Sequence, residues 1–214
     1  ARELKRRRPE ASGGIGHLVE GPTTAAALIY GRERFFTLPY EDPARAHQLL
    51  AFSVRSMVNY ARAITEHAGT PLSPGLRGIP DDFAGIFPPA LFEEFVVPYL
   101  DAMFMGLQAT ERHLHSELLR AEHLPFLRRL RLAHLDVCGD QYLPPELLRD
   151  HSPTKFSLHI QPWHVRDLSA QELQDMYRHL ASFRPTVITF SLSRLEDEPK
   201  IRSLLRVARE MCEH

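Results

Sequence analysis

Histidine and acidic side chains recur at alternate positions in the middle of the chain. His113, His115 and Glu117 are each separated by one residue, and alternate residues of a β-strand point to the same face. An imidazole and a carboxylate on one face suit Zn²⁺ or another first-row divalent ion. Such a metal would lower the pKa of a bound thiol and create a thiolate nucleophile. The alternative is that these side chains bind only substrate or structural water.

Further polar residues stand at or just after other short apolar runs. Asp81 and Asp82 are adjacent, so they could share a proton or orient a cationic substrate group, and capping of a helix N-terminus is the competing explanation. Trp163 is the only tryptophan, and it is predicted either to wall a large planar ligand, such as a corrin or porphyrin, or to pack in the core. The other residues predicted to bind substrate are Asp140, His159 and Gln161.

Three other residues are given structural roles. His123 and His134 fall in helix and early-strand positions, where packing explains them better than metal binding. Cys138 precedes Gly139 and is expected to be a small packed residue rather than a nucleophile. Only one other cysteine is present, at position 212, and no CxxC pair occurs. This cysteine usage predicts a reducing, cytoplasmic environment.

The elements that must position these residues alternate along the chain. Short β-prone runs are followed by longer segments of helical period, which is typical of βαβ units and a parallel sheet. The pattern predicts strands at 15–19, 76–80, 113–116, 132–137, 156–160 and 186–190. It predicts helices at 23–30, 43–67, 89–107, 121–130, 144–149, 169–182 and 200–212, with the third bent at Pro98. Ser169 and Glu172 have the spacing of a capping box.

Composition sets the class of the protein. The chain has 214 residues, 43% of them hydrophobic and 25% charged, with a net charge of −1. It is interpreted as one domain covering residues 1–214. The balanced charge gives no global attraction for nucleic acid or anionic membranes. We find no apolar run of the roughly 18–20 residues that a membrane span needs, and no nucleotide-binding GxGxxG or GxxxxGK[ST] motif follows the first predicted strand.

Several segments, taken in order, resemble the uroporphyrinogen decarboxylase family, which includes methyltransferases linked to cobalamin and coenzyme M. Residues 21–26, Gly-Pro-Thr-Thr-Ala-Ala, resemble its Gly-Pro-Phe-Thr-x-Ala segment. Residues 40–43, Tyr-Glu-Asp-Pro, resemble the entry to its next helix. Residues 81–99 are the strongest match, with Asp-Asp, then Phe-x-x-Phe and Pro-Tyr. Residues 156–163 resemble a strand that ends in a polar residue and proline.

The resemblance implies a TIM (β/α)8 barrel in which our first strand aligns with the third of the family. The first two βα units are therefore expected to be absent. It also implies that His115 matches the family's metal-binding histidine and Glu117 its first metal-binding cysteine. The family's last cysteine ligand would lie near residues 191–197, where this chain has none. The thiolate-rich zinc site is therefore not reproduced, and a His and carboxylate site is the form left open.

Three functional hypotheses follow. The leading one is a methyltransferase-like enzyme, acting on a small-molecule substrate with a corrinoid protein as a possible partner. Asp82, His115 and Glu117 would be its catalytic residues. The second is a divergent uroporphyrinogen decarboxylase of porphyrin biosynthesis, a lyase, although the units that carry that enzyme's arginines and key aspartate are expected to be missing. The third is a non-catalytic barrel subunit. Open sheet edges must be covered, so a homo-oligomer or a partner chain is expected at the seam.

Overall fold

The computed structural model describes residues 6–7, 19–139 and 142–212. These residues form an α/β fold around a five-stranded, fully parallel sheet in the order β1-β2-β3-β4-β5. The strands are β1 (Gly75–Pro80), β2 (Ala109–His115), β3 (His134–Asp136), β4 (Lys155–Ile160) and β5 (Val187–Phe190). Strands that are consecutive in sequence are therefore neighbours in space, and the predicted parallel sheet is confirmed.

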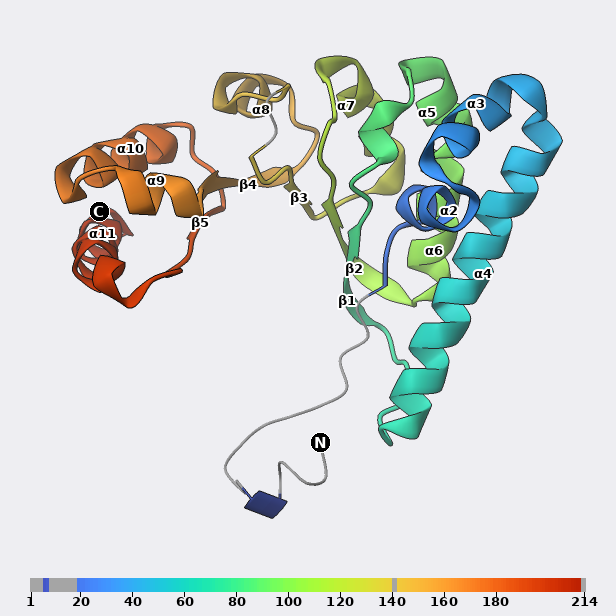
Figure 1. The fold of residues 1–214 in the computed structure, drawn as a ribbon, viewed down its shortest axis with the longest axis horizontal. Helices are drawn as coiled ribbons and strands as arrows, with labels where there is room; N and C mark the ends of the chain where they lie inside the picture. The colour runs from blue at the N-terminus through green and yellow to red at the C-terminus, as the bar shows by residue number, and fades with distance from the viewer. Residues whose placement is uncertain (1–5, 8–18, 140–141, 213–214) are drawn as a thin grey trace.

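Helices connect the strands (Figure 1). They are α2 (Pro22–Tyr30), α3 (Arg32–Glu41), α4 (Pro43–His67), α5 (Pro89–Phe95), α6 (Val97–Gly106), α7 (Leu124–Leu127), α8 (Pro145–His151), α9 (Pro162–Asp167), α10 (Ala170–Ser182) and α11 (Glu198–Cys212). The long helix α4 has the predicted bounds. Asp42 caps it by accepting a hydrogen bond from the amide of Arg45, and Pro43 occupies its first turn, where no amide hydrogen is needed.

One predicted helix is wrong. The segment 89–107 forms two helices, α5 and α6, which meet at Val96, rather than one bent helix. Pro98 has no amide hydrogen to donate to the carbonyl four residues earlier, and its ring would clash there. The chain therefore ends one helix and starts another with Pro98 in the first turn, where proline is favoured.

Other boundaries differ in smaller ways. The predicted helix at 121–130 is a single α-turn, α7, between two short 3-10 segments, and the strand predicted at 132–137 is three residues long. The sequence pattern missed α3 and α9. The strand predicted at 15–19 lies outside the described residues except for Val19, which is buried. Two residues later, the amide of Gly21 donates to the carbonyl of Pro80, 2.5 Å away, so this segment runs beside the end of β1.

The two faces of the sheet differ in chemistry. Alternate residues such as Leu114, Leu135 and Leu158 point into a core covered by helices, while His115, Asp136 and Ser157 occupy the other parity. The core has a large cluster between β1–β4 and helices α2–α8 and a smaller one around α9, α10 and α11. Figure 1 shows these last three helices beside β5, away from α4.

No helix in the described ranges is long and apolar enough to span a bilayer.

Candidate active site

Asp136 is the centre of a hydrogen-bond cluster at the carboxyl ends of β2, β3 and β4. Its Oδ2 lies 3.0 Å from Nδ1 of His115, and its Oδ1 lies 2.6 Å from Nε2 of His159. The same Oδ1 accepts from the hydroxyl of Ser157 at 2.8 Å and from the amide of Cys138 at 3.0 Å. Burial alone would raise the pKa of Asp136, but these donors hold it well below its usual range. Asp136 is therefore a fixed negative charge between two imidazoles.

His115 lies between two carboxylates. Its Nδ1 faces Asp136, and its Nε2 is 3.3 Å from Oδ1 of Asp82. The hydrogen bond to Asp136 is the main cause of a raised His115 pKa, against which partial burial acts, and the charges of Asp136, Asp82 and Glu117 raise it further. This arrangement orients the ring and stabilises an imidazolium ion, as an acid–base catalyst requires.

Asp82 presents an acceptor that its surroundings leave unsatisfied. Its Oδ1 is shielded from solvent and has no hydrogen-bond partner among the described residues, because the contact with His115 lacks hydrogen-bond alignment. Glu20 lies close enough that its pKa is raised, first by burial and then by the charge of Asp82. The acidic groups Glu20, Asp82 and Asp136 thus lie around His115.

Asp81 has a different environment from the neighbouring Asp82. It is fully buried, and its carboxylate accepts from the amides of Thr23 and Thr24 and from the hydroxyl of Thr24, at 2.7–3.2 Å. Burial raises the pKa of Asp81 to about 6. These contacts cap the N-terminus of α2, so the structure places Asp81 in the capping role that sequence left open, with its oxygens engaged by the protein.

The donor set can be compared with what a zinc ion needs. A structural or catalytic zinc site takes at least three protein ligands. Within residues 19–139 and 142–212, no group of three or more His, Cys, Asp or Glu side chains is placed to hold a metal. His115 has Asp136 on one nitrogen and Asp82 near the other. The described residues therefore do not form a metal site by themselves, and the predicted ligation by His115 and Glu117 stays a prediction.

The remaining predicted residues fall into two places. His159 joins the Asp136 cluster. Gln161 and Trp163 line a separate cavity beyond the ends of β3 and β4. Asp140, predicted to bind substrate, lies outside the described residues. The structure thus brings Asp82, His115 and His159 together around Asp136 and places Gln161 and Trp163 next to them.

A cavity of about 420 Å³ lies on the polar face of the sheet, lined by residues of all five strands. His115, Asp136 and Ser157 line it near the strand ends, and His113 and His134 line it further back. The rings of these last two are 5.3 Å apart. Burial and the neighbouring His113 lower the pKa of His134. The structure therefore places His134 on this polar face, beside His113.

His123 was given a structural role from sequence, while Asp136 and Ser157 were given no role. His123 is buried, and its ring is hydrogen-bonded to the carbonyl of Phe87 at 2.9 Å and to the amide of Arg120 at 3.0 Å, so its structural role is confirmed. Asp136 was placed at a strand end from sequence but was given no role, and Ser157 was not selected. The available signal was parity: Asp136 follows His134 by two residues, and the register places it between His115 and Ser157.

The chain is similar to known proteins both in sequence and in fold. The family model for uroporphyrinogen decarboxylase (URO-D) matches residues 4–139. A solved methyltransferase from Methanosarcina mazei has a similar fold, with a TM-score of 0.70 and 14% sequence identity. That match covers 98% of this chain and 62% of the methyltransferase chain. At this identity the likeness shows the fold alone, and this chain spans less than two thirds of the solved one. No curated protein matches the sequence.

Proposed function

The chain belongs to the uroporphyrinogen decarboxylase family, and from this membership we propose that it is a methyltransferase-like member. It would move a methyl group between a carrier, such as a corrinoid on a partner protein, and a small acceptor. The observation that carries the proposal is His115, held between Asp82 and Asp136 where β2 and β3 end. A corrinoid, when bound, would supply the transferable methyl group.

The proposed fold is a TIM (β/α)8 barrel of the uroporphyrinogen decarboxylase type. Three observations support it: the parallel sheet, the sequential strand order and the fold likeness. In such barrels, active sites lie at the carboxyl ends of the strands. That rule agrees with the position of the Asp136 cluster and with the polar face that lines the cavity.

The proposed mechanism uses His115 as a base. The acceptor loses its proton to Nε2 of His115, and its freed electron pair forms the new bond to the methyl carbon. The methylated carrier, when bound, would supply this methyl group and would keep the electron pair of the bond that breaks. Asp136 stabilises the imidazolium that forms, since it faces Nδ1 at 3.0 Å. Asp82 orients a positively polarised part of the acceptor through its unsatisfied Oδ1.

The second candidate, a divergent decarboxylase, is favoured by the same raised His115 pKa. A protonated His115 would donate its proton to the carbon that loses carbon dioxide. The two functions predict opposite pH responses. A base must be neutral to act, so methyl transfer rises with pH through the His115 pKa, whereas a reaction that needs the imidazolium falls with pH.

The test follows transfer from methylcobalamin to a panel of small thiols, observed by the cobalamin spectrum, across a pH series. His115→Gln is expected to reduce the rate by roughly a hundredfold or more, the usual contribution of a general base. It should also remove the rise of the rate with pH. His151→Gln is the matched control, because His151 is exposed at the end of α8 and away from the cluster.

Unchanged transfer in His115→Gln, or a rising pH limb that survives the substitution, would overturn the assignment of the base. Turnover of a porphyrinogen with a rate that falls as pH rises would support the second candidate instead.

We also propose that the outer edge of β5 in the described sheet is covered by a second copy or a partner chain. An edge strand exposes unpaired backbone groups, and Val187 of β5 leaves about half of its surface exposed. Light scattering tests this. A stable monomer that binds little of an apolar dye would contradict both self-association and an exposed apolar edge at β5. If the chain assembles in this way and catalyses neither methyl transfer nor decarboxylation, it would be the non-catalytic barrel subunit of the third hypothesis.

A further inference from the structure

We infer that the cavity beside Trp163 binds a small, planar, uncharged heterocycle. It has a volume of about 320 Å³ and lies at the carboxyl ends of β3 and β4, next to α8, α9 and α10. It differs from the cavity on the polar face of the sheet, since the two have no lining residue in common. The inference concerns binding alone, so it can fail or succeed independently of methyl transfer.

One wall is formed by an amide held in a fixed position. Gln161 is 8% exposed, and its Nε2 lies 3.6 Å from Sγ of Cys138. A Cβ at Gly139 would lie 2.6 Å from the same Nε2, so the absence of a side chain there lets Gln161 lie against the backbone. The thiol is a weak acceptor. The amide therefore keeps the capacity to bond a better acceptor on a ligand.

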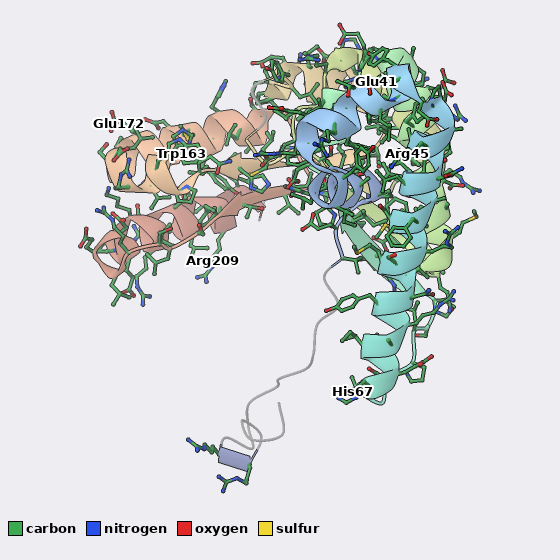
Figure 2. All side chains as sticks on the ribbon, turned by 45° about the vertical axis from the view of Figure 1, so that its right-hand side comes forward. Glu41, Arg45, His67, Trp163, Glu172 and Arg209 are labelled. Carbon is green, nitrogen blue, oxygen red and sulfur yellow. The ribbon has the colours of Figure 1, made fainter. Side chains whose placement is uncertain are left out.

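A second wall supplies an aromatic surface. Trp163 is 52% exposed, although tryptophan is highly buried on average. Figure 2 shows it on α9, well apart from the long helix whose start and end are marked by Arg45 and His67. Leu158 and Leu180 line the same cavity. An indole next to aliphatic side chains favours a flat apolar ring that would cover part of the exposed indole.

The charge and size of the cavity restrict the ligand further. The described lining residues include two histidines but no Asp, Glu, Lys or Arg, so the described walls carry no permanent charge to pair with a phosphate or a carboxylate. Its volume is at the lower end of the roughly 300–1,000 Å³ of ligand pockets. That space suits a ring system of one or two rings, and it is small for the corrin or porphyrin that the sequence suggested for Trp163.

His159 connects this cavity to the Asp136 cluster. Its ring lines the cavity, while its Nε2 lies 2.6 Å from Asp136. A ligand here would thus contact the side chain that shares a carboxylate with His115.

The test titrates the protein with benzimidazole at neutral pH and follows the fluorescence of Trp163, the only tryptophan. Benzoate, a flat ring with a negative charge, is the matched probe. Benzimidazole is expected to give a saturable change, and benzoate to bind at least about tenfold more weakly. Gln161→Leu should weaken benzimidazole roughly three- to tenfold, the effect of one neutral hydrogen bond. Ser203→Ala, on α11, is the control variant.

A second measurement does not depend on the indole. In a Cys212→Ser background, alkylation of the partly exposed Cys138 should slow when benzimidazole is bound. A linear, unsaturable fluorescence response, equal binding of benzoate, equal binding by Gln161→Leu, or an unchanged alkylation rate would each overturn the inference.

Discussion

At the scale of single residues, the main feature is one carboxylate shared by two imidazoles. Asp136 faces His115 and His159 through different oxygens, so one carboxylate orients both rings. Ser157 and the amide of Cys138 fix the carboxylate further. This is why substitution of Asp136 should change both histidines together.

Asp136→Asn tests this coupling. The variant loses the charge and the strongest cause of the raised His115 pKa, so that pKa is expected to move down toward the ordinary value of about 6.5. NMR titration of the His115 ring measures the shift. Asp150→Asn, which removes an exposed carboxylate paired with its neighbour Arg149, should leave the His115 titration unchanged. An unshifted His115 in Asp136→Asn would contradict the assigned role.

The same groups set the pH dependence of folding stability. Because the folded pKa of His115 is raised, its contribution is complete below about pH 6.5 and is lost as pH rises through the folded pKa. Because that of Asp136 is lowered, its contribution is complete above about pH 4 and is lost as pH falls below that value. Urea unfolding across pH should show the alkaline loss in the native protein and a smaller one in His115→Gln.

Sequence predicted part of this site for physical reasons. The His115 and Asp82 positions follow from strand-end location and parity, which are local properties. The Asp136 cluster depends on how three strands align, and the alignment is set by packing of the whole sheet. Asp81 shows the same limit, since its two candidate roles differ only in whether Thr23 and Thr24 lie within reach.

At the scale of elements, α2 is anchored by the buried carboxylate of Asp81. Gly21 is in close contact with it, because a Cβ at this position would lie 2.3 Å from the Cβ of Asp81. Gly21→Ala should therefore displace the cap and destabilise the fold by about 1–3 kcal/mol, the usual cost of overpacking. Chemical denaturation measures this. Gly78→Ala has nothing within 4 Å of the added Cβ and should be close to neutral.

The start of α10 offers a second test. Ser169 accepts from the amide of Glu172, and the Glu172 carboxylate accepts from the amide of Ser169, which is the capping box that the sequence predicted. Ser169→Ala should cost about 1 kcal/mol of the free energy of unfolding. Glu172→Gln retains an acceptor at the same position and should cost less. Equal losses in the two variants would argue against the reciprocal cap.

Element prediction succeeded where the signal was local. The bounds of α4 follow from Pro43 and an apolar stripe of helical period, and the cap at Ser169 follows from spacing alone. The division between α5 and α6 at Val96 was missed because Pro98 permits either a bend or a restart. Which of these occurs depends on the packing of Phe92, Phe95 and Leu100, which are all fully or almost fully buried.

At the scale of the whole molecule, the core is divided into two clusters. The smaller one contains Leu204, which is fully buried, together with Val165 and Leu173. Leu204→Ala should cost about 2–5 kcal/mol locally. Hydrogen exchange is expected to accelerate first in α10 and α11 and to change least in β1 and β2, since local openings occur in contiguous units. Uniform acceleration across all five strands would show that the clusters unfold as one.

The sequential order of the strands has a consequence for synthesis of the chain. Each strand from β2 to β5 pairs with the strand that precedes it, so no pairing within the described sheet has to wait for a segment made much later. As the ribosome extends the chain, β1 and β2 can pair before β3 emerges, and the α9–α11 cluster forms last. The fold therefore suits vectorial, co-translational assembly, in which N-terminal parts fold first.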